Sequence, residues 1–150
     1  MSQRLSGMMQ AIEPREDINI SPETAARWVK LYFANFRALD AQLPLDEQLM
    51  LGLPLLGGLA YVDVEASASI IYHHVILRGM LLDAELRLHR RELSASIYRT
   101  VIPCLERWQH EAGQRLIDFQ AAYLMSWMAA DFFDYNLSWN CFRRACAIGR

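Results

Sequence analysis

The chain has 150 residues, of which 53% are apolar and 21% are charged, and its formal net charge is −2. This composition excludes an intrinsically disordered chain, which combines low hydrophobicity with high net charge. Seven glycines and five prolines exclude a collagen-like or low-complexity chain. Proteins that bind nucleic acid through its phosphates usually carry a basic surplus, which is missing here. We therefore expect no direct nucleic-acid contact by this chain.

The three cysteines, Cys104, Cys141 and Cys146, form no Cys-x-x-Cys pair. They predict reduced thiols rather than a disulfide framework or a zinc site. No secretory signal is visible in the first twenty residues. The uncharged stretch from Leu49 to Val62 is shorter than the roughly 20 residues of a membrane span and contains Pro54. We expect a soluble protein of the cytosol or the nucleus.

We expect residues 1–20 to be a weakly ordered lead-in and residues 21–150 to form a helical domain. Ser21-Pro22-Glu23 is typical of a helix start, with a serine cap, a proline in the first turn and an acid at the positive end of the dipole. This helix should end near Leu39-Asp40, and its apolar face comprises Trp28, Val29, Tyr32, Phe33 and Phe36. Asp46 should cap a second helix from Glu47 to about Leu53, which Pro54 and Gly57-Gly58 then kink or end.

Asp63 should cap a long third helix from Val64 to about Arg91. Ser94 should start a fourth helix that ends at Gly113 and kinks at Pro103. Residues 115–134 predict a fifth helix. A turn is expected at Asn136-Leu137-Ser138, before a last helix that carries Trp139, Phe142 and Ile148. The prediction is an all-α fold, an irregular bundle of about six helices.

Two Glu-x-x-x-His spacings are the strongest hint of an enzyme, Glu85 with His89 and Glu106 with His110. Residues four apart share a helix face and could present two metal ligands. Di-iron helical bundles place Glu and His three apart instead, and other charged residues surround both pairs here. Solvated pairs on exposed faces are the favoured interpretation. A small metal-dependent helical enzyme built on these four residues is the alternative hypothesis.

Other titratable residues have less specific patterns. His73 and His74 point about 100° apart on a helix, so we expect one near the core and one at its boundary. Asp118, Asp131 and Asp134 could do acid–base chemistry in a cleft, but acids at helix ends more often mark a solvent edge. No phosphate-binding loop, nucleophile elbow or His-Glu-x-x-His motif is present. We expect no enzyme activity, no cofactor and no metal.

Aromatic and methionine side chains recur on the predicted helix faces. They favour a core, and the alternative is a pocket for a small apolar effector, lined by Trp28, Trp108, Trp127, Trp139, Met125 and Met128. The last helix is apolar for a free end. It indicates a protein partner, a second copy or the remainder of a longer regulator.

The segment from Leu116 to Trp127 carries a Gln120-Ala121 pair followed by Leu124 and by Ser126-Trp127. Ser138-Trp139 then starts the next helix, which continues with Arg143 or Arg144, Ala145 and Gly149. This pattern resembles the middle homology region of fungal-specific transcription factors, the regulators with a zinc binuclear cluster. Upstream, Trp28 to Phe36 resembles the opening helix of that domain. The signature residues are structural: Gln120, Ala121, Leu124, Trp127, Trp139, Ala145 and Gly149.

The resemblance implies a non-enzymatic regulatory module in a fungal nucleus, inhibitory or effector-sensing, with no catalytic residues to transfer. The chain departs from the family in lacking the six-cysteine cluster that reads DNA, and it has no coiled-coil segment. We therefore expect a partial regulatory domain whose partners are other proteins or the rest of a longer regulator. A plain protein-interaction bundle without a ligand remains a third hypothesis.

Overall fold

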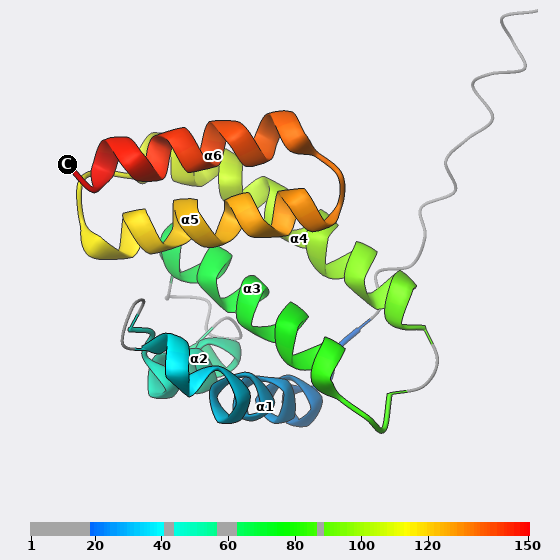
Figure 1. The fold of residues 1–150 in the computed structure, drawn as a ribbon. Helices are drawn as coiled ribbons and strands as arrows, with labels where there is room; N and C mark the ends of the chain where they lie inside the picture. The colour runs from blue at the N-terminus through cyan, green and yellow to red at the C-terminus, as the bar shows by residue number, and fades with distance from the viewer. Residues whose placement is uncertain (1–18, 41–43, 57–62, 87–88) are drawn as a thin grey trace, which may run out of the picture.

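The computed structural model describes residues 19–40, 44–56, 63–86 and 89–150 (Figure 1). These residues form six helices packed together and contain no strand, which confirms the predicted all-α class. The first 18 residues of the predicted lead-in and the Gly57-Gly58 pair lie outside this part of the chain. The helices are α1 (Pro22–Asp40), α2 (Glu47–Leu56), α3 (Ala66–Leu82), α4 (Arg90–Glu111), α5 (Leu116–Asp131) and α6 (Tyr135–Ile148).

Helix α3 is the centre of the bundle. It contacts α1, α2, α4 and α5, and Figure 1 shows it running between the α1–α2 pair and the α5–α6 pair. A helix that is apolar around most of its circumference is stable only when it is buried on several sides. This explains why α3 contains a single charged residue, Arg78, and is mostly buried. The largest fully buried side chains of the protein include Trp28, Met50, Ile70, Leu77, Met80, Met125 and Met128.

Gly79 allows α1 to approach α3 closely. A Cβ atom at this position would lie 1.9 Å from the backbone oxygen of Trp28, which no real side chain could do without moving α1. Trp28 itself is 1% exposed, so the contact lies in the core. The requirement for glycine at this position is therefore steric and does not come from the backbone dihedral angles.

The predicted starts of α1 and α2 are confirmed. The backbone N–H of Thr24 donates to Ser21 Oγ at 3.2 Å, and the N–H of Leu49 donates to Asp46 Oδ1 at 3.1 Å. Both bonds satisfy donors that a helix leaves free in its first turn. Helix α2 continues through Pro54 to Leu56 instead of ending at Leu53. A proline so near the end of a helix removes only one backbone hydrogen bond.

The single helix predicted from Val64 to Arg91 is wrong at both ends. Helix α3 begins at Ala66, and Asp63 does not cap it. The helix ends at Leu82 because Asp83 is buried. Its carboxylate accepts bonds from Trp28 Nε1 at 2.9 Å, Arg27 at 2.6 Å and the backbone N–H of Glu85 at 3.1 Å. The chain therefore turns at Asp83.

Two other predicted boundaries are also wrong. Helix α4 begins at Arg90 rather than Ser94, whose hydroxyl donates to the Arg90 carbonyl at 2.7 Å, and it continues through Pro103. Helix α6 begins at Tyr135, where a turn over residues 136–138 was expected. Asp134 provides the cap by accepting from the Leu137 N–H at 3.2 Å.

Candidate functional site

The α5–α6 hairpin brings the family-signature residues together. Ala121, Leu124 and Ala145 are buried between the two helices and the rest of the core. The buried Gln120 donates from Nε2 to the Pro44 carbonyl at 2.6 Å, which ties α5 to the segment before α2. Gly149 is exposed, and a Cβ atom there would make only ordinary contacts with Phe119. Packing explains the signature inside the hairpin, and nothing in the structure explains the glycine.

Helix α6 presents two separate apolar stripes. The inner stripe packs against the core and comprises Leu137, Cys141, Ala145 and Ile148. The outer stripe is exposed and comprises Tyr135, Trp139, Phe142 and Cys146. The outer residues are spaced by four, three and four positions, so they follow one side of the helix. An exposed apolar stripe at this spacing is the arrangement by which one helix receives another.

The outer stripe forms one wall of a groove, and α5 forms the other. We call it the aromatic groove and define it by Arg78, Trp127, Tyr135, Trp139 and Phe142, which line a cavity of about 660 Å³. The four aromatic side chains are 42%, 64%, 60% and 41% exposed, in that order. Trp and Tyr side chains dominate the binding energy of protein–protein interfaces. An uncovered cluster of them is therefore a candidate interaction surface.

Arg78 holds one end of the aromatic groove in place. Its guanidinium forms an ion pair with Asp131 at 2.7 Å and lies 6.0 Å from the ring centroid of Trp127. The contact with the indole is at the outer range of a cation–π interaction. Arg78 belongs to the central helix α3, so it fixes the groove to the core of the protein.

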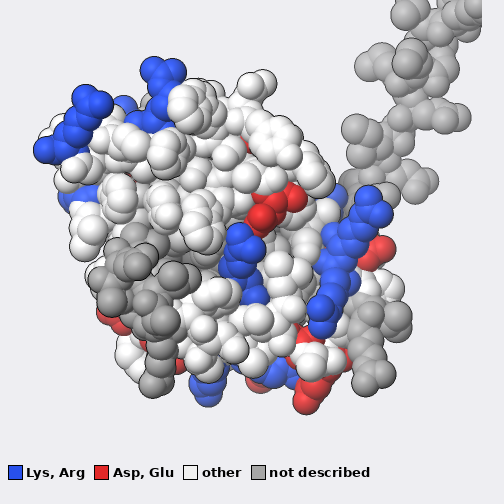
Figure 2. All heavy atoms as spheres, viewed as in Figure 1, with Lys and Arg blue, Asp and Glu red and all other residues white. Residues whose placement is uncertain are grey.

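The other end of the groove is basic. A second hollow of about 340 Å³ continues from Trp139 and Phe142 and is lined by Arg143, Cys146 and Arg150. Neither arginine has an ion pair within the described residues. Figure 2 shows a largely uncharged surface over α5 and α6, with basic side chains gathered near the C-terminus. We call Arg143 and Arg150 the basic end.

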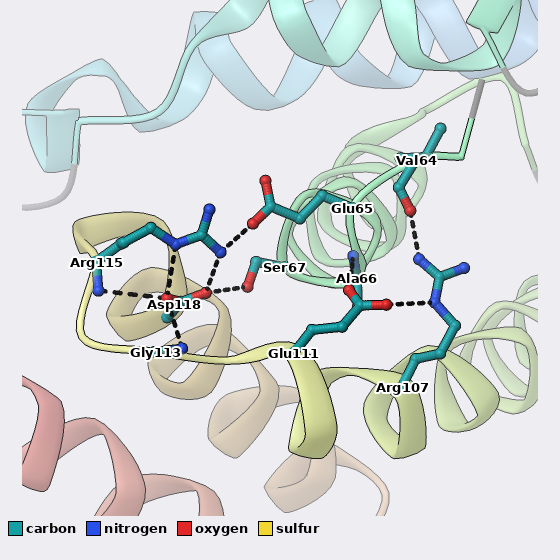
Figure 3. Close-up of polar contacts among 9 residues, drawn as sticks. All are labelled: Val64, Glu65, Ala66, Ser67, Arg107, Glu111, Gly113, Arg115 and Asp118. Carbon is teal, nitrogen blue, oxygen red and sulfur yellow. Dashed lines mark hydrogen bonds and ion pairs between the residues drawn. The ribbon is translucent and has the colours of Figure 1, made fainter.

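A buried carboxylate fixes the start of α5 (Figure 3). Asp118, predicted to mark a solvent edge, is fully buried. It accepts bonds from Ser67 Oγ at 2.8 Å, from the Gly113 N–H at 3.0 Å and from the Arg115 guanidinium at 2.9 Å. Burial by itself would raise the pKa of Asp118, but these donors outweigh it and hold the pKa below its ordinary value. The cluster is structural, because every oxygen of Asp118 already has partners.

Neighbouring polar contacts fasten the same corner of the molecule. Arg115 also pairs with Glu65, and Arg107 pairs with Glu111 at 3.2 Å and donates to the Val64 carbonyl. These residues come from the start of α3, the end of α4 and the start of α5, as Figure 3 shows. The network joins three helix ends and so sets the direction in which α5 leaves the core.

A separate cavity, of about 550 Å³, lies among α1, α2, α3 and α4 and includes Tyr72, His73 and Thr100 in its lining. Burial raises the pKa of Tyr72 to about 12 and lowers that of His73, whose ring also contacts the Ser69 carbonyl at 2.6 Å. Both groups are therefore neutral at pH 7. This cavity has the size of a small-molecule pocket, but none of the tryptophans and methionines of the predicted effector pocket lines it.

The two adjacent histidines differ as predicted, with His74 in the core and His73 at its boundary. His74 is 3% exposed, and its Nδ1 has no hydrogen-bond partner in the part of the chain that the structure describes. Burial, together with the positive charge of Arg78, lowers the pKa of His74 to about 3. His74 is therefore an uncharged core residue.

The four residues of the alternative enzyme hypothesis do not form one site. Glu85 lies in the turn after α3 and pairs with Arg27 at 2.9 Å, whereas His89 precedes α4. Glu106 and His110 lie near the other end of α4, roughly 25 Å and 30 Å, respectively, along the helix axis from His89. All four are exposed. Across the described ranges, no group of three or more His, Cys, Asp or Glu side chains could hold a metal ion.

The predicted tryptophan and methionine pocket divides into two parts. Trp28, Trp108, Met125 and Met128 are buried and belong to the core. Trp127 and Trp139 are exposed in the aromatic groove.

Within the described residues, no helix has both the length and the apolar character to cross a membrane.

Comparisons with protein-family models, with curated proteins and with solved structures find no significant match to this chain. The resemblance to the fungal regulators therefore rests on the residues quoted for it and stays a prediction.

Sequence reasoning missed two members of the aromatic groove, Tyr135 and Arg78, and the ion pair of Arg78 with Asp131. Tyr135 was assigned to the segment before the last helix, and Arg78 and Asp131 were not connected to the aromatic side chains. The spacing of Tyr135, Trp139, Phe142 and Cys146 was the available signal. It is visible only when α6 is started at Tyr135, which requires Asp134 to be recognised as the cap.

Proposed function

We propose that this chain is a non-enzymatic interaction module of a transcription regulator of the fungal zinc-cluster kind, and that it acts in the nucleus by docking another protein segment in the aromatic groove. The observation that carries the proposal is the exposure of four aromatic side chains in one groove. Monomeric soluble proteins rarely leave such a patch uncovered without a function.

The sequence resemblance supports the regulatory part of the proposal. Its signature residues meet in the α5–α6 hairpin, and the same hairpin forms the two walls of the groove. The buried signature residues hold the hairpin together, whereas Trp127 and Trp139 are left on its outer side. In this proposal the former are the scaffold and the latter are the contact residues.

A tethered reporter experiment tests this function. The whole chain is fused to a heterologous DNA-binding domain in a fungal cell that carries a matching reporter gene. We expect the fusion to raise or lower transcription relative to the DNA-binding domain alone. The double variant Trp127→Ala with Trp139→Ala should return the reporter to baseline, because one interface hot spot is worth about 2 kcal/mol, or roughly 30-fold in affinity.

Leu55→Ala is the matched control, since Leu55 is 71% exposed on α2 and lies outside the aromatic groove. This variant should behave like the unchanged fusion. A fusion that is present in the nucleus at normal levels and leaves the reporter unchanged would contradict the proposal. Stoichiometric iron or manganese in the purified protein, together with a turnover, would instead favour the enzyme hypothesis.

A further inference from the structure

The outer stripe of α6 has the geometry of a helix-binding seam. Tyr135, Trp139, Phe142 and Cys146 recur at four, three and four residues, and Trp127 of α5 stands opposite them across the groove. A helix docks in such a groove with apolar anchors at positions i, i+3 or i+4, and i+7. A peptide that binds by β-strand addition would instead need an exposed sheet edge, and the described residues contain no strand.

The charges of the groove are arranged asymmetrically. At the end near α3, the positive charge of Arg78 is neutralised by Asp131 at 2.7 Å. At the other end, the guanidinium groups of Arg143 and Arg150 have no ion pair among the described residues. Residues 135–150 contain no Asp or Glu side chain, although the whole chain has a net charge of −2. The basic end is therefore a local feature that attracts negative charge.

From these two observations we propose that the aromatic groove binds an amphipathic α-helix of another protein, with apolar anchors along one side and Asp or Glu at the end that lies on Arg143 and Arg150. The inference rests on the proposed docking function and adds the chemistry of the partner. The apolar anchors cover the exposed rings, and the acidic end neutralises the basic end.

Two other occupants fit the observations less well. The α6 helix of a second copy of this chain would bring more arginines without ion pairs to the groove. It could not neutralise them, because residues 135–150 contain no Asp or Glu. A nucleic acid would find only two unpaired arginines along the groove and a negatively charged protein around them. The experiment distinguishes both from the acidic helix.

The test uses fluorescence anisotropy with the full chain and labelled helical peptides of about 18 residues. The first peptide has leucine anchors at helical spacing and four glutamates at one end. The second has lysines in place of the glutamates, and the third is a scrambled version of the first. We expect saturable binding of the acidic peptide with a Kd in the micromolar range. The lysine and scrambled peptides should bind at least tenfold more weakly.

Variants of the protein test the apolar contact and the charge contact separately. Trp139→Ala should weaken binding of the acidic peptide roughly 30-fold, because a central tryptophan is a typical hot spot. The double variant Arg143→Glu with Arg150→Glu should reverse the preference, so that the lysine peptide binds more tightly than the acidic one. Leu55→Ala should bind as the unchanged chain does. Circular dichroism of each variant checks that the helices are retained.

Four outcomes would overturn the inference. Two concern the peptides: equal binding of the acidic and scrambled peptides, or no saturable binding of the acidic peptide. The other two are a dimer in sedimentation that Trp139→Ala dissociates, and displacement of the acidic peptide by a single-stranded oligonucleotide at equal concentration.

The reporter experiment separates this inference from the proposed function. If the fusion changes transcription through the groove but the acidic peptide does not bind, only the partner chemistry is wrong. If the peptide binds but the fusion is inert, the regulatory function is wrong.

Discussion

Two buried carboxylates, Asp83 and Asp118, determine where helices of this protein end and begin. Asp83 lies at the end of α3 and Asp118 in the first turn of α5, and each carboxylate accepts a bond from a distant helix, Asp83 from Trp28 and Asp118 from Ser67. A buried ionised carboxylate is tolerated only with such partners. Asp83 stabilises the turn that ends α3, and Asp118 stabilises the first turn of α5. The unfolding behaviour of the protein should therefore depend on pH through a few identifiable groups.

Replacing Asp118 by asparagine should lower the free energy of unfolding at pH 7 by about 2 kcal/mol, because buried hydrogen bonds to a charged group are lost. The pKa of Asp118 is held below its ordinary value of 3.8, so this stabilisation is present above that pH and is lost as the pH falls through the lower pKa of the folded state. Urea unfolding measures it. Glu106→Gln, at an exposed carboxylate outside this network, is the control and should change stability by less than about 0.5 kcal/mol.

His74 should make the protein less stable in mild acid. Its pKa is about 3 when folded and 6.5 in the unfolded chain, so between these values the unfolded state binds the extra proton. The free energy of unfolding should fall by up to about 1.4 kcal/mol for each pH unit below 6.5 through this residue. His74→Leu should remove that slope in urea unfolding between pH 6.5 and 5. An unchanged slope would contradict the assignment, and the exposed His110→Leu should keep it.

At the scale of the elements, the close approach of α1 to α3 depends on Gly79. Alanine normally stabilises a helix relative to glycine by roughly 0.5–1 kcal/mol. At Gly79 the added Cβ would meet the backbone of Trp28, so Gly79→Ala should instead lower the melting temperature and cost about 3 kcal/mol. Gly52→Ala in α2 is the matched control, since nothing lies within 4 Å of its Cβ position, and it should raise the melting temperature.

The helices themselves could be predicted from the sequence, because the apolar spacing and the Ser21 and Asp46 caps are local signals. The break at Asp83 could not, since its partners Arg27 and Trp28 are more than fifty residues away in the chain. The burial of Asp118 was missed because its donor on α3, Ser67, is 51 residues away in the chain. Of the candidate site, Trp127 and Trp139 were identified as residues of interest. Their exposure could not be predicted, because the same pattern also describes core tryptophans such as Trp28.

At the scale of the whole molecule, the helices differ in how many neighbours cover them. Helix α3 contacts α1, α2, α4 and α5, whereas α6 packs mainly on α5 and leaves its outer stripe uncovered. Regions that share few buried contacts open at lower free energy than the core. Stability should therefore fall from the centre of the bundle towards the α6 edge.

Amide hydrogen exchange tests this order. The amides of α3 should exchange last, by global unfolding, and those of α6 should exchange earlier through local opening. Addition of the acidic helical peptide should slow exchange in α6 and leave α3 unchanged. Equal protection of α3 and α6 in the free protein would show that the bundle unfolds as one cooperative unit, contrary to this expectation.

The four tryptophans divide evenly between interior and surface, with Trp28 and Trp108 buried and Trp127 and Trp139 in the groove. Indole emission is sensitive to water, so the two pairs should emit at different wavelengths. Acrylamide should quench only the outer pair. The protein thus contains an intrinsic optical reporter, in which the quenchable half of the signal registers whether the groove is open or occupied and the other half monitors the fold.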